Sequence, residues 1–182
     1  MTIALRRPLT VEDYVAWAEA QTERQRTELI NGQIVAMAPE RVEHGEVELA
    51  ATIALRTAIA RAGLDCHALG DGMTVRIDEH TGYEPDALVY CGPRLARGSI
   101  IVPNPLIIVE VLSPATAHTD SSAKLVGYFK RQSVMHYLVL DPDARSVTHH
   151  MRDRLPEVLT AGRLRLDPPG LDLTVEELLG SA

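Results

Sequence analysis

Two acidic side chains stand beside apolar runs, where folding would hold their carboxylates away from water. Asp86 opens the run at 87–90, and Glu110 stands inside the run at 106–112. A buried carboxylate is costly unless it is paired, protonated or bound to a metal ion. With Lys124 nearby in a predicted helix, two carboxylates and one lysine could hold a divalent cation and a water. Oxygen ligands of this kind favour Mg²⁺ or Mn²⁺ over zinc.

A structural ion pair is the alternative explanation for Glu110. In that case an Arg or Lys from a covering helix would neutralise the carboxylate, as charged pairs in protein cores do. The presence of Asp86 and Lys124 in addition to Glu110 favours a metal site over an ion pair. The residues alone, however, leave both interpretations open.

Three further residues are candidates for the same site. Glu28 lies on the same side of its predicted strand as Ile30, so its carboxylate could face the core. An acid in a hairpin is more commonly exposed to solvent, and that explanation stays open. His44 falls in the first turn of a predicted helix and could help to hold a phosphate there, although such a histidine is more often a surface residue. Asp120, four residues before Lys124, could support the metal ligands without binding the ion itself. An N-cap or a surface ion pair is the favoured interpretation of this residue.

Local patterns predict the elements that must position these residues. Thr10 to Asp13 has the form of a capping box, and Asn31-Gly32 between apolar stretches is a strong hairpin signal. Strands alternating with helices indicate an α/β protein. The predicted helices cover 11–20, 43–62, 120–131 and a short segment after Thr174; the predicted strands cover 27–37 as a hairpin, 66–69, 73–77, 86–90, 106–112, 135–140, 146–151 and 157–166.

Length and composition predict one folded domain spanning residues 1–182. The chain is 46% hydrophobic and 24% charged, which is ordinary for a globular protein. No run of residues has the apolar length of a transmembrane span, and the start of the sequence does not have a signal-peptide pattern, so neither a signal peptide nor a membrane partner is expected. Cys66 and Cys91 lack CxxC spacing and are expected to be free thiols in a reducing cytoplasm.

The charge balance limits how the protein could bind nucleic acid. Its net charge is −7 and aromatic residues make up 4% of the chain. Binding of duplexes by a broad basic face, or of bases by stacking on aromatic rings, is therefore not expected. A nucleic-acid role would need a local basic patch, or a metal site that offsets the acidity.

The order of the motifs resembles a bacterial family of restriction-endonuclease-like proteins within the PD-(D/E)XK nuclease superfamily. The resemblance extends from about Thr10 to Asp143 and implies a restriction endonuclease-like fold, a mixed β-sheet flanked by α-helices. Asp86, Glu110 and Lys124 should then converge at one sheet edge. The motifs are ELI-N-G at 28–32, EPD at 84–86, VEVLSP at 109–114, D-x-x-x-K-L-x-x-Y at 120–128 and YLVLDP at 137–142.

The resemblance also implies roles for individual residues. Asp86 corresponds to the first metal-binding aspartate, Glu110 to the second acid, and Glu28 to an acid that approaches the same metal. The Val111 carbonyl would complete the ligands of one or two Mg²⁺ (or Mn²⁺) ions.

Three positions depart from the superfamily pattern. The superfamily lysine normally lies two residues after the second acid, where this chain has Leu112, and Lys124 stands in its place. Ser121 replaces a basic residue that commonly follows the helix aspartate, and His136 replaces an acidic residue before the strand tyrosine. None of these positions is a ligand, so the expected metal site is intact.

The function implied is that of a metal-dependent endonuclease that hydrolyses phosphodiester bonds in DNA, with Lys124 orienting the water or stabilising the transition state. A homodimer is expected by family likeness, through C-terminal edge strands that carry Val147, Val158 and Leu164. Two alternatives stay open. One is a non-catalytic binding protein that retains the nuclease fold, and the other is a phosphodiesterase acting on small molecules.

Overall fold

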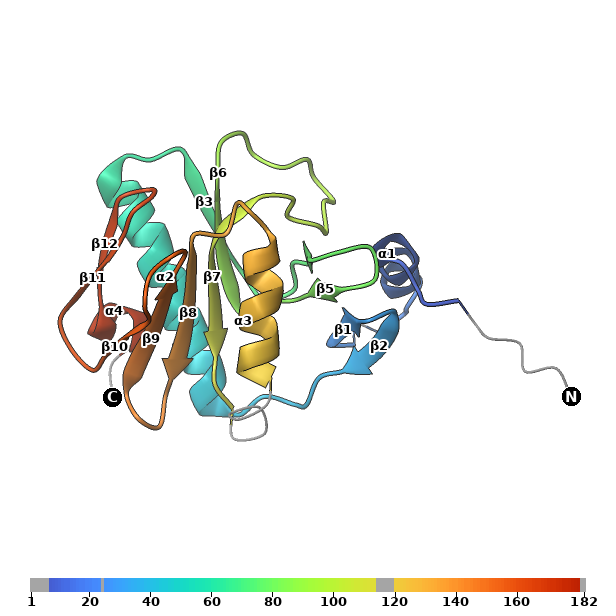
Figure 1. The fold of residues 1–182 in the computed structure, drawn as a ribbon, viewed down its shortest axis with the longest axis horizontal. Helices are drawn as coiled ribbons and strands as arrows, with labels where there is room; N and C mark the ends of the chain where they lie inside the picture. Colours follow the sequence, from blue (N-terminus) through green and yellow to red (C-terminus); the bar gives the residue numbers. More distant parts are fainter. Residues whose placement is uncertain (1–6, 24, 114–119, 181–182) are drawn as a thin grey trace, which may run out of the picture.

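A six-stranded sheet forms the centre of the protein in a computed structural model, which describes residues 7–23, 25–113 and 120–180 without the side chains of 120 and 121 (Figure 1). The strand order is β10-β9-β8-β7-β6-β3. Only β7 and β8 run parallel, and the other neighbours are antiparallel, so the sheet is mixed. The strands are β3 Cys66–Gly70, β6 Ala87–Cys91, β7 Pro105–Val111, β8 His136–Asp141, β9 Ser146–Met151 and β10 Glu157–Leu159.

Helices cover both faces of this sheet (Figure 1). Helix α2 (Val42–Ala62) packs its alanine-rich stripe on one face, where Ile107 and Val109 of β7 are buried. Helix α3 (Asp120–Lys130) packs on the opposite face through Tyr128, because side chains along a strand alternate between the two faces. The predicted mixed sheet flanked by α-helices is confirmed. Within the described ranges, no helix is both long and apolar enough to cross a membrane.

A smaller sheet of order β2-β1-β5-β4 lies beside the large one and carries helix α1 (Figure 1). The predicted hairpin is confirmed: Asn31 and Gly32 have φ values of 50° and 77°, as a type I′ turn requires. The predicted capping box of α1 is also present, between Thr10 and Asp13. The elements are α1 Val11–Glu19, β1 Thr27–Ile30, β2 Gln33–Ala36, β4 Val75–Arg76 and β5 Gly82–Tyr83.

The C-terminal strands only partly follow the expectation of a single meander. β9 and β10 extend the large sheet, whereas β11 (Arg163–Leu166) and β12 (Leu171–Thr174) form a separate pair before α4 (Val175–Leu179). The capping box predicted at Thr174 is present. Val147 and Leu164 are buried, and only Val158, 68% exposed, lies on an accessible edge strand.

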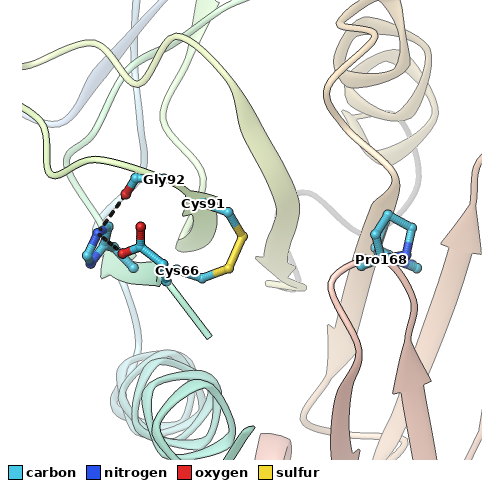
Figure 2. The surroundings of a disulfide bond; sticks show 7 residues. Cys66, Cys91, Gly92 and Pro168 are labelled. Atoms are coloured by element: carbon cyan, nitrogen blue, oxygen red, sulfur yellow. Dashed lines mark hydrogen bonds and ion pairs between the residues drawn. A yellow bond between two sulfur atoms is a disulfide. The ribbon is translucent and has the colours of Figure 1, made fainter. Parts of the chain in front are cut away.

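The prediction of free thiols is wrong, because Cys66 and Cys91 form a disulfide (Figure 2). The two residues stand 25 apart in sequence but are directly opposite each other in the antiparallel β3–β6 pair. CxxC spacing says nothing about partners that strand register brings together. The argument from reduced thiols to a cytoplasmic location therefore no longer applies.

A buried histidine pair joins β8 to β9. The Pro168 carbonyl lies 2.8 Å from His136 Nε2 and can only accept, so His136 Nδ1 accepts in turn from His149 Nε2, at 2.9 Å. Burial lowers the pKa of His136, and burial together with the neighbouring imidazoles lowers the pKa of His149 to about 4. Both rings are therefore neutral in the folded protein near pH 7.

We expect His149 to destabilise the fold in acid. Since its folded-state pKa lies below the ordinary value of 6.5, its contribution is complete above pH 6.5 and is lost as the pH falls toward 4. Between pH 7 and pH 5 this loss should amount to about 2 kcal/mol of unfolding free energy. His149→Gln keeps a donor but does not titrate. Urea denaturation should therefore show a smaller loss for this variant, and an equal loss would contradict the assignment.

Candidate active site

Asp86 and Glu110 come from neighbouring strand ends because β6 and β7 are antiparallel. Ala87 is opposite Val109, so the start of β6 lies beside the end of β7. Asp86 is buried, and its Oδ2 accepts a hydrogen bond of 2.6 Å from the Val111 backbone N–H. The backbone of one strand thereby fixes the carboxylate that the next strand supplies.

Lys124 lies between two glutamates that come from different sheets. Its Nζ is 3.0 Å from Glu28 Oε1 and 3.0 and 3.2 Å from the two oxygens of Glu110. Tyr128, one helical turn further along α3, donates its hydroxyl to Glu110 Oε1 at 2.7 Å. The side chains of Glu28, Glu110 and Lys124 are thus brought together, each from a separate element.

The interpretation of Glu28 as a solvated hairpin residue is wrong, because Glu28 is only 4% exposed. Its Oε1 also accepts the backbone N–H of Glu84 at 2.9 Å. The alternation of side chains along a strand placed Glu28 on the same side as Ile30. It could not indicate which side of the hairpin faces the large sheet.

His44 is also buried, at 8% exposed, so the interpretation as a surface residue is wrong as well. Its Nε2 lies 3.1 Å from the Val111 carbonyl, which can only accept, so Nε2 carries the proton and Nδ1 a lone pair. Burial lowers the pKa of His44, which keeps the ring neutral. Nδ1 is buried, makes no hydrogen bond to a described residue, and lies 3.4 Å from Glu40 Oε1.

His44 belongs to a group of potential ligands that the sequence reasoning missed in part. Glu40, His44, Glu48 and Asp86 each offer one ligand atom, and these atoms all lie within 4.8 Å of one another. Glu48 stands four residues after His44 in α2 and shares a face with it, whereas Glu40 precedes the helix, whose N-cap is Arg41. The spacing of His44 and Glu48 was the available signal. Asp86 is the one member shared with the predicted ligands, whereas Glu28 and Glu110 contact Lys124.

Members of both groups line one cavity of about 470 Å³, although Glu48 is not in its lining. The Val111 carbonyl, already engaged by His44, has a second lone pair for another partner. The side chain of Asp120 lies outside the described residues. His136 contacts His149 and Pro168, which do not line this cavity, so that departure from the superfamily pattern leaves the site unchanged. The lining includes Arg26, Glu28, His44, Asp86, Glu110 and Lys124.

Burial dominates the electrostatics of the carboxylates. It raises the pKa of Asp86 to about 7 and that of Glu110 to about 7, while the positive charge of Lys124 acts in the opposite direction on both. The pKa of Glu28 is raised for the same reason. Near neutral pH the cluster therefore favours an added positive charge, either protons or a cation.

The chain matches the family described as "Putative restriction endonuclease" (Uma2) over residues 11–177. It belongs to this family. The protein slr1290 of Synechocystis sp. (strain ATCC 27184 / PCC 6803 / Kazusa), described as uncharacterized, is 27% identical over 176 residues, covering 92% of this chain and 90% of that protein. The Uma2 assignment confirms the resemblance inferred from the motifs.

A solved structure shares the fold. It is described as a "putative nuclease belonging to DUF820" from Anabaena variabilis ATCC 29413 and superimposes with a TM-score of 0.75 at 18% identity, covering 94% of this chain and 98% of that one. The fold is therefore restriction endonuclease-like. Family and structural neighbour together support a nuclease-like function for this Uma2 protein.

We expect Asp86→Asn to stabilise the protein without added cations, because Asn can still accept the Val111 N–H but carries no charge. The pKa of folded Asp86, about 7, lies above the ordinary 3.8, so ionisation reduces stability as the pH rises through this range. The advantage of the variant over wild type should grow by about 2–3 kcal/mol from pH 5 to pH 8. Denaturation in a chelator measures it, with exposed Asp143→Asn as control. An advantage that does not change with pH would contradict the raised pKa.

Proposed function

We propose that this Uma2 protein is a metal-dependent endonuclease that hydrolyses phosphodiester bonds in DNA. One observation carries the proposal: Lys124, the buried acids Glu28 and Asp86, and Glu110, whose side chain is 12% exposed, line a single cavity. A buried set of acids with one lysine is poorly suited to stability alone, because each buried charge is costly. It is well suited to binding a cation and an anionic phosphate side by side.

The residues fit a divalent cation. The buried Nδ1 of His44 has a lone pair but no hydrogen-bond partner among the described residues, and Nε2 faces a backbone carbonyl, as in metal-binding histidines generally. Glu40, His44, Glu48 and Asp86 would hold one ion. Glu110, Glu28 and the Val111 carbonyl are the other candidate ligands. An imidazole among carboxylates favours Mn²⁺ over Mg²⁺.

The chemistry that Mg²⁺ or Mn²⁺ supplies when bound is polarisation of a phosphoryl oxygen and a lower pKa for water. Lys124 would stabilise the negative charge that develops on the phosphate, since its Nζ is fixed in the cavity by Glu28 and Glu110. Tyr128 keeps Glu110 in one orientation through its hydroxyl. Glu28 would orient the attacking water.

The net charge of −7 favours a second candidate, a phosphodiesterase acting on small molecules, which needs no basic surface. The protein should be assayed with Mn²⁺ on plasmid DNA and on bis(p-nitrophenyl) phosphate. Cleavage of DNA supports the endonuclease, and cleavage of the small ester alone supports the second candidate. Cation binding without cleavage of either would favour a non-catalytic binding protein.

Glu110 and Lys124 should differ in what they contribute. We expect Glu110→Gln to weaken Mn²⁺ binding by about 10- to 100-fold, as loss of a carboxylate near a cation does. Lys124→Met should bind Mn²⁺ much like wild type but lose cleavage by about 100-fold or more, because the lysine acts on the transition state. Calorimetry and cleavage assays measure the two effects, with exposed Glu43→Gln as the control for charge.

A purely structural ion pair predicts the reverse pattern. Lys124→Met would then leave buried carboxylates uncompensated and cost about 3–5 kcal/mol of stability. Glu110→Gln would bind Mn²⁺ as wild type does. Observing both results would show that the catalytic assignment is wrong.

The proposed assembly is a homodimer that pairs β10 with its copy across a twofold axis. β10 is the edge of the large sheet, and Val158 and Leu155 beside it are exposed. We expect light scattering to give twice the chain mass for wild type and a monomer for Val158→Lys, because charged side chains on an edge oppose strand pairing. A monomeric wild type at working concentration would contradict this assembly.

A further inference from the structure

Arg26 is a second positively charged residue in the cavity that Lys124 lines, and the proposed function gives it no role. It stands immediately before β1, and its carbonyl accepts the Met37 backbone N–H at 2.9 Å, which continues the β1–β2 hairpin by one more pair. Being two residues before Glu28, it points to the same side of the extended chain. Both side chains accordingly line the cavity.

The guanidinium is held by charge more than by hydrogen bonds. Nη1 pairs with Glu40, while Nε lies 3.4 Å from Asp71 Oδ2 and Nη2 lies 3.9 Å from Asp86 Oδ1. Nε and Nη2 are both buried and donate no hydrogen bond to a described residue. The side chain as a whole is 24% exposed, so part of it faces the cavity although Nε and Nη2 themselves are shielded from solvent. Buried donors without acceptors are rare in folded proteins and call for an explanation.

Lys124 differs in this respect. Its Nζ is within 3.0–3.2 Å of three carboxylate oxygens from Glu28 and Glu110, so its three donors have acceptors. Arg26 has five N–H donors in a planar fork, and this shape matches two oxygens of a phosphate. Of these two cations, Arg26 is the one with donor capacity left for a ligand.

We propose that Arg26 binds the non-bridging oxygens of the substrate phosphodiester beside Asp86. The proposal rests on the proposed function and adds to it the residue that anchors the phosphate. Glu40, Asp71 and Asp86 keep the guanidinium in place by charge, and Nε and Nη2 then have donors available to an anionic oxygen. The competing explanation is that Arg26 only neutralises these three acids, for which any positive charge would serve.

Substitutions that separate charge from shape distinguish the two explanations. Arg26→Lys keeps the charge and loses the fork, and Arg26→Gln loses both. Arg41→Gln is the matched control, because Arg41 lines the same cavity but is exposed. The probes are dimethyl phosphate, followed by ³¹P NMR, and a short DNA duplex, followed by fluorescence anisotropy. Each is titrated with Ca²⁺ present, and the affinity for Ca²⁺ and the melting temperature are measured separately.

We expect Arg26→Lys to bind both probes about 10- to 100-fold more weakly than wild type, as loss of a paired charged hydrogen bond predicts. Its Ca²⁺ affinity and melting temperature should stay close to wild type. Arg41→Gln should change binding of dimethyl phosphate less than threefold, roughly the size of a screened surface charge effect.

Unchanged binding of dimethyl phosphate by Arg26→Lys would overturn the proposal. The proposal would also fail if only Arg26→Gln bound the probes more weakly and its melting temperature were lowered but restored by Ca²⁺. The proposal would likewise be overturned if the wild-type protein bound neither probe. The proposed endonuclease function would then still be tested separately, by the DNA cleavage assay on the wild-type protein. If wild type binds dimethyl phosphate through Arg26 but does not bind the duplex, the Arg26 assignment holds and DNA is not the substrate.

Discussion

The repulsion among buried carboxylates is the constraint on which the rest of this structure depends. Asp86 and Glu110 each lose solvation in the cavity, and Glu28 adds a third acid close to Lys124. Two like charges a few ångströms apart in a poorly solvated site repel by several kcal/mol. The arrangement persists because the elements that carry the acids cannot separate, and Lys124 offsets part of the repulsion.

The hydrophobic packing supplies that rigidity. The two faces of β7 are covered by different helices, with Val109 and Val111 toward α2 and Ile108 toward α3. Glu110 thus stands on a strand that is clamped from both sides. Because α2 brings His44, α3 brings Lys124 and the small sheet brings Glu28, the site exists only where the two sheets and two helices meet. Any loosening of this packing would let the acids move apart and would relax their raised pKa values.

The sequence predicted the parts of the site that local patterns determine. Glu110 could be identified because a charged residue interrupts a β-branched apolar run, whereas Lys124, a lysine in the predicted helix over 120–131, received its role from the family resemblance. For Glu28 and His44 the residues alone favoured an exposed position, since periodicity gives the side of an element but not what packs on that side, and only the family resemblance placed Glu28 near the metal. The Cys66–Cys91 bridge was missed for a related reason, because the register of two strands is a tertiary property.

The acidity of the chain and a nucleic-acid substrate are compatible once distance is considered. At physiological ionic strength, charges more than about 8 Å apart are largely screened from one another when exposed to solvent. The net charge of −7 therefore slows the approach of DNA but acts weakly on a phosphate already in the cavity. In the cavity, the groups in direct contact with the phosphate determine its binding energy. These groups include the ammonium of Lys124 and the guanidinium of Arg26, which are both partly or wholly shielded from water. Specificity for a phosphodiester would then arise from the few ångströms around Asp86, and not from the overall field of the protein.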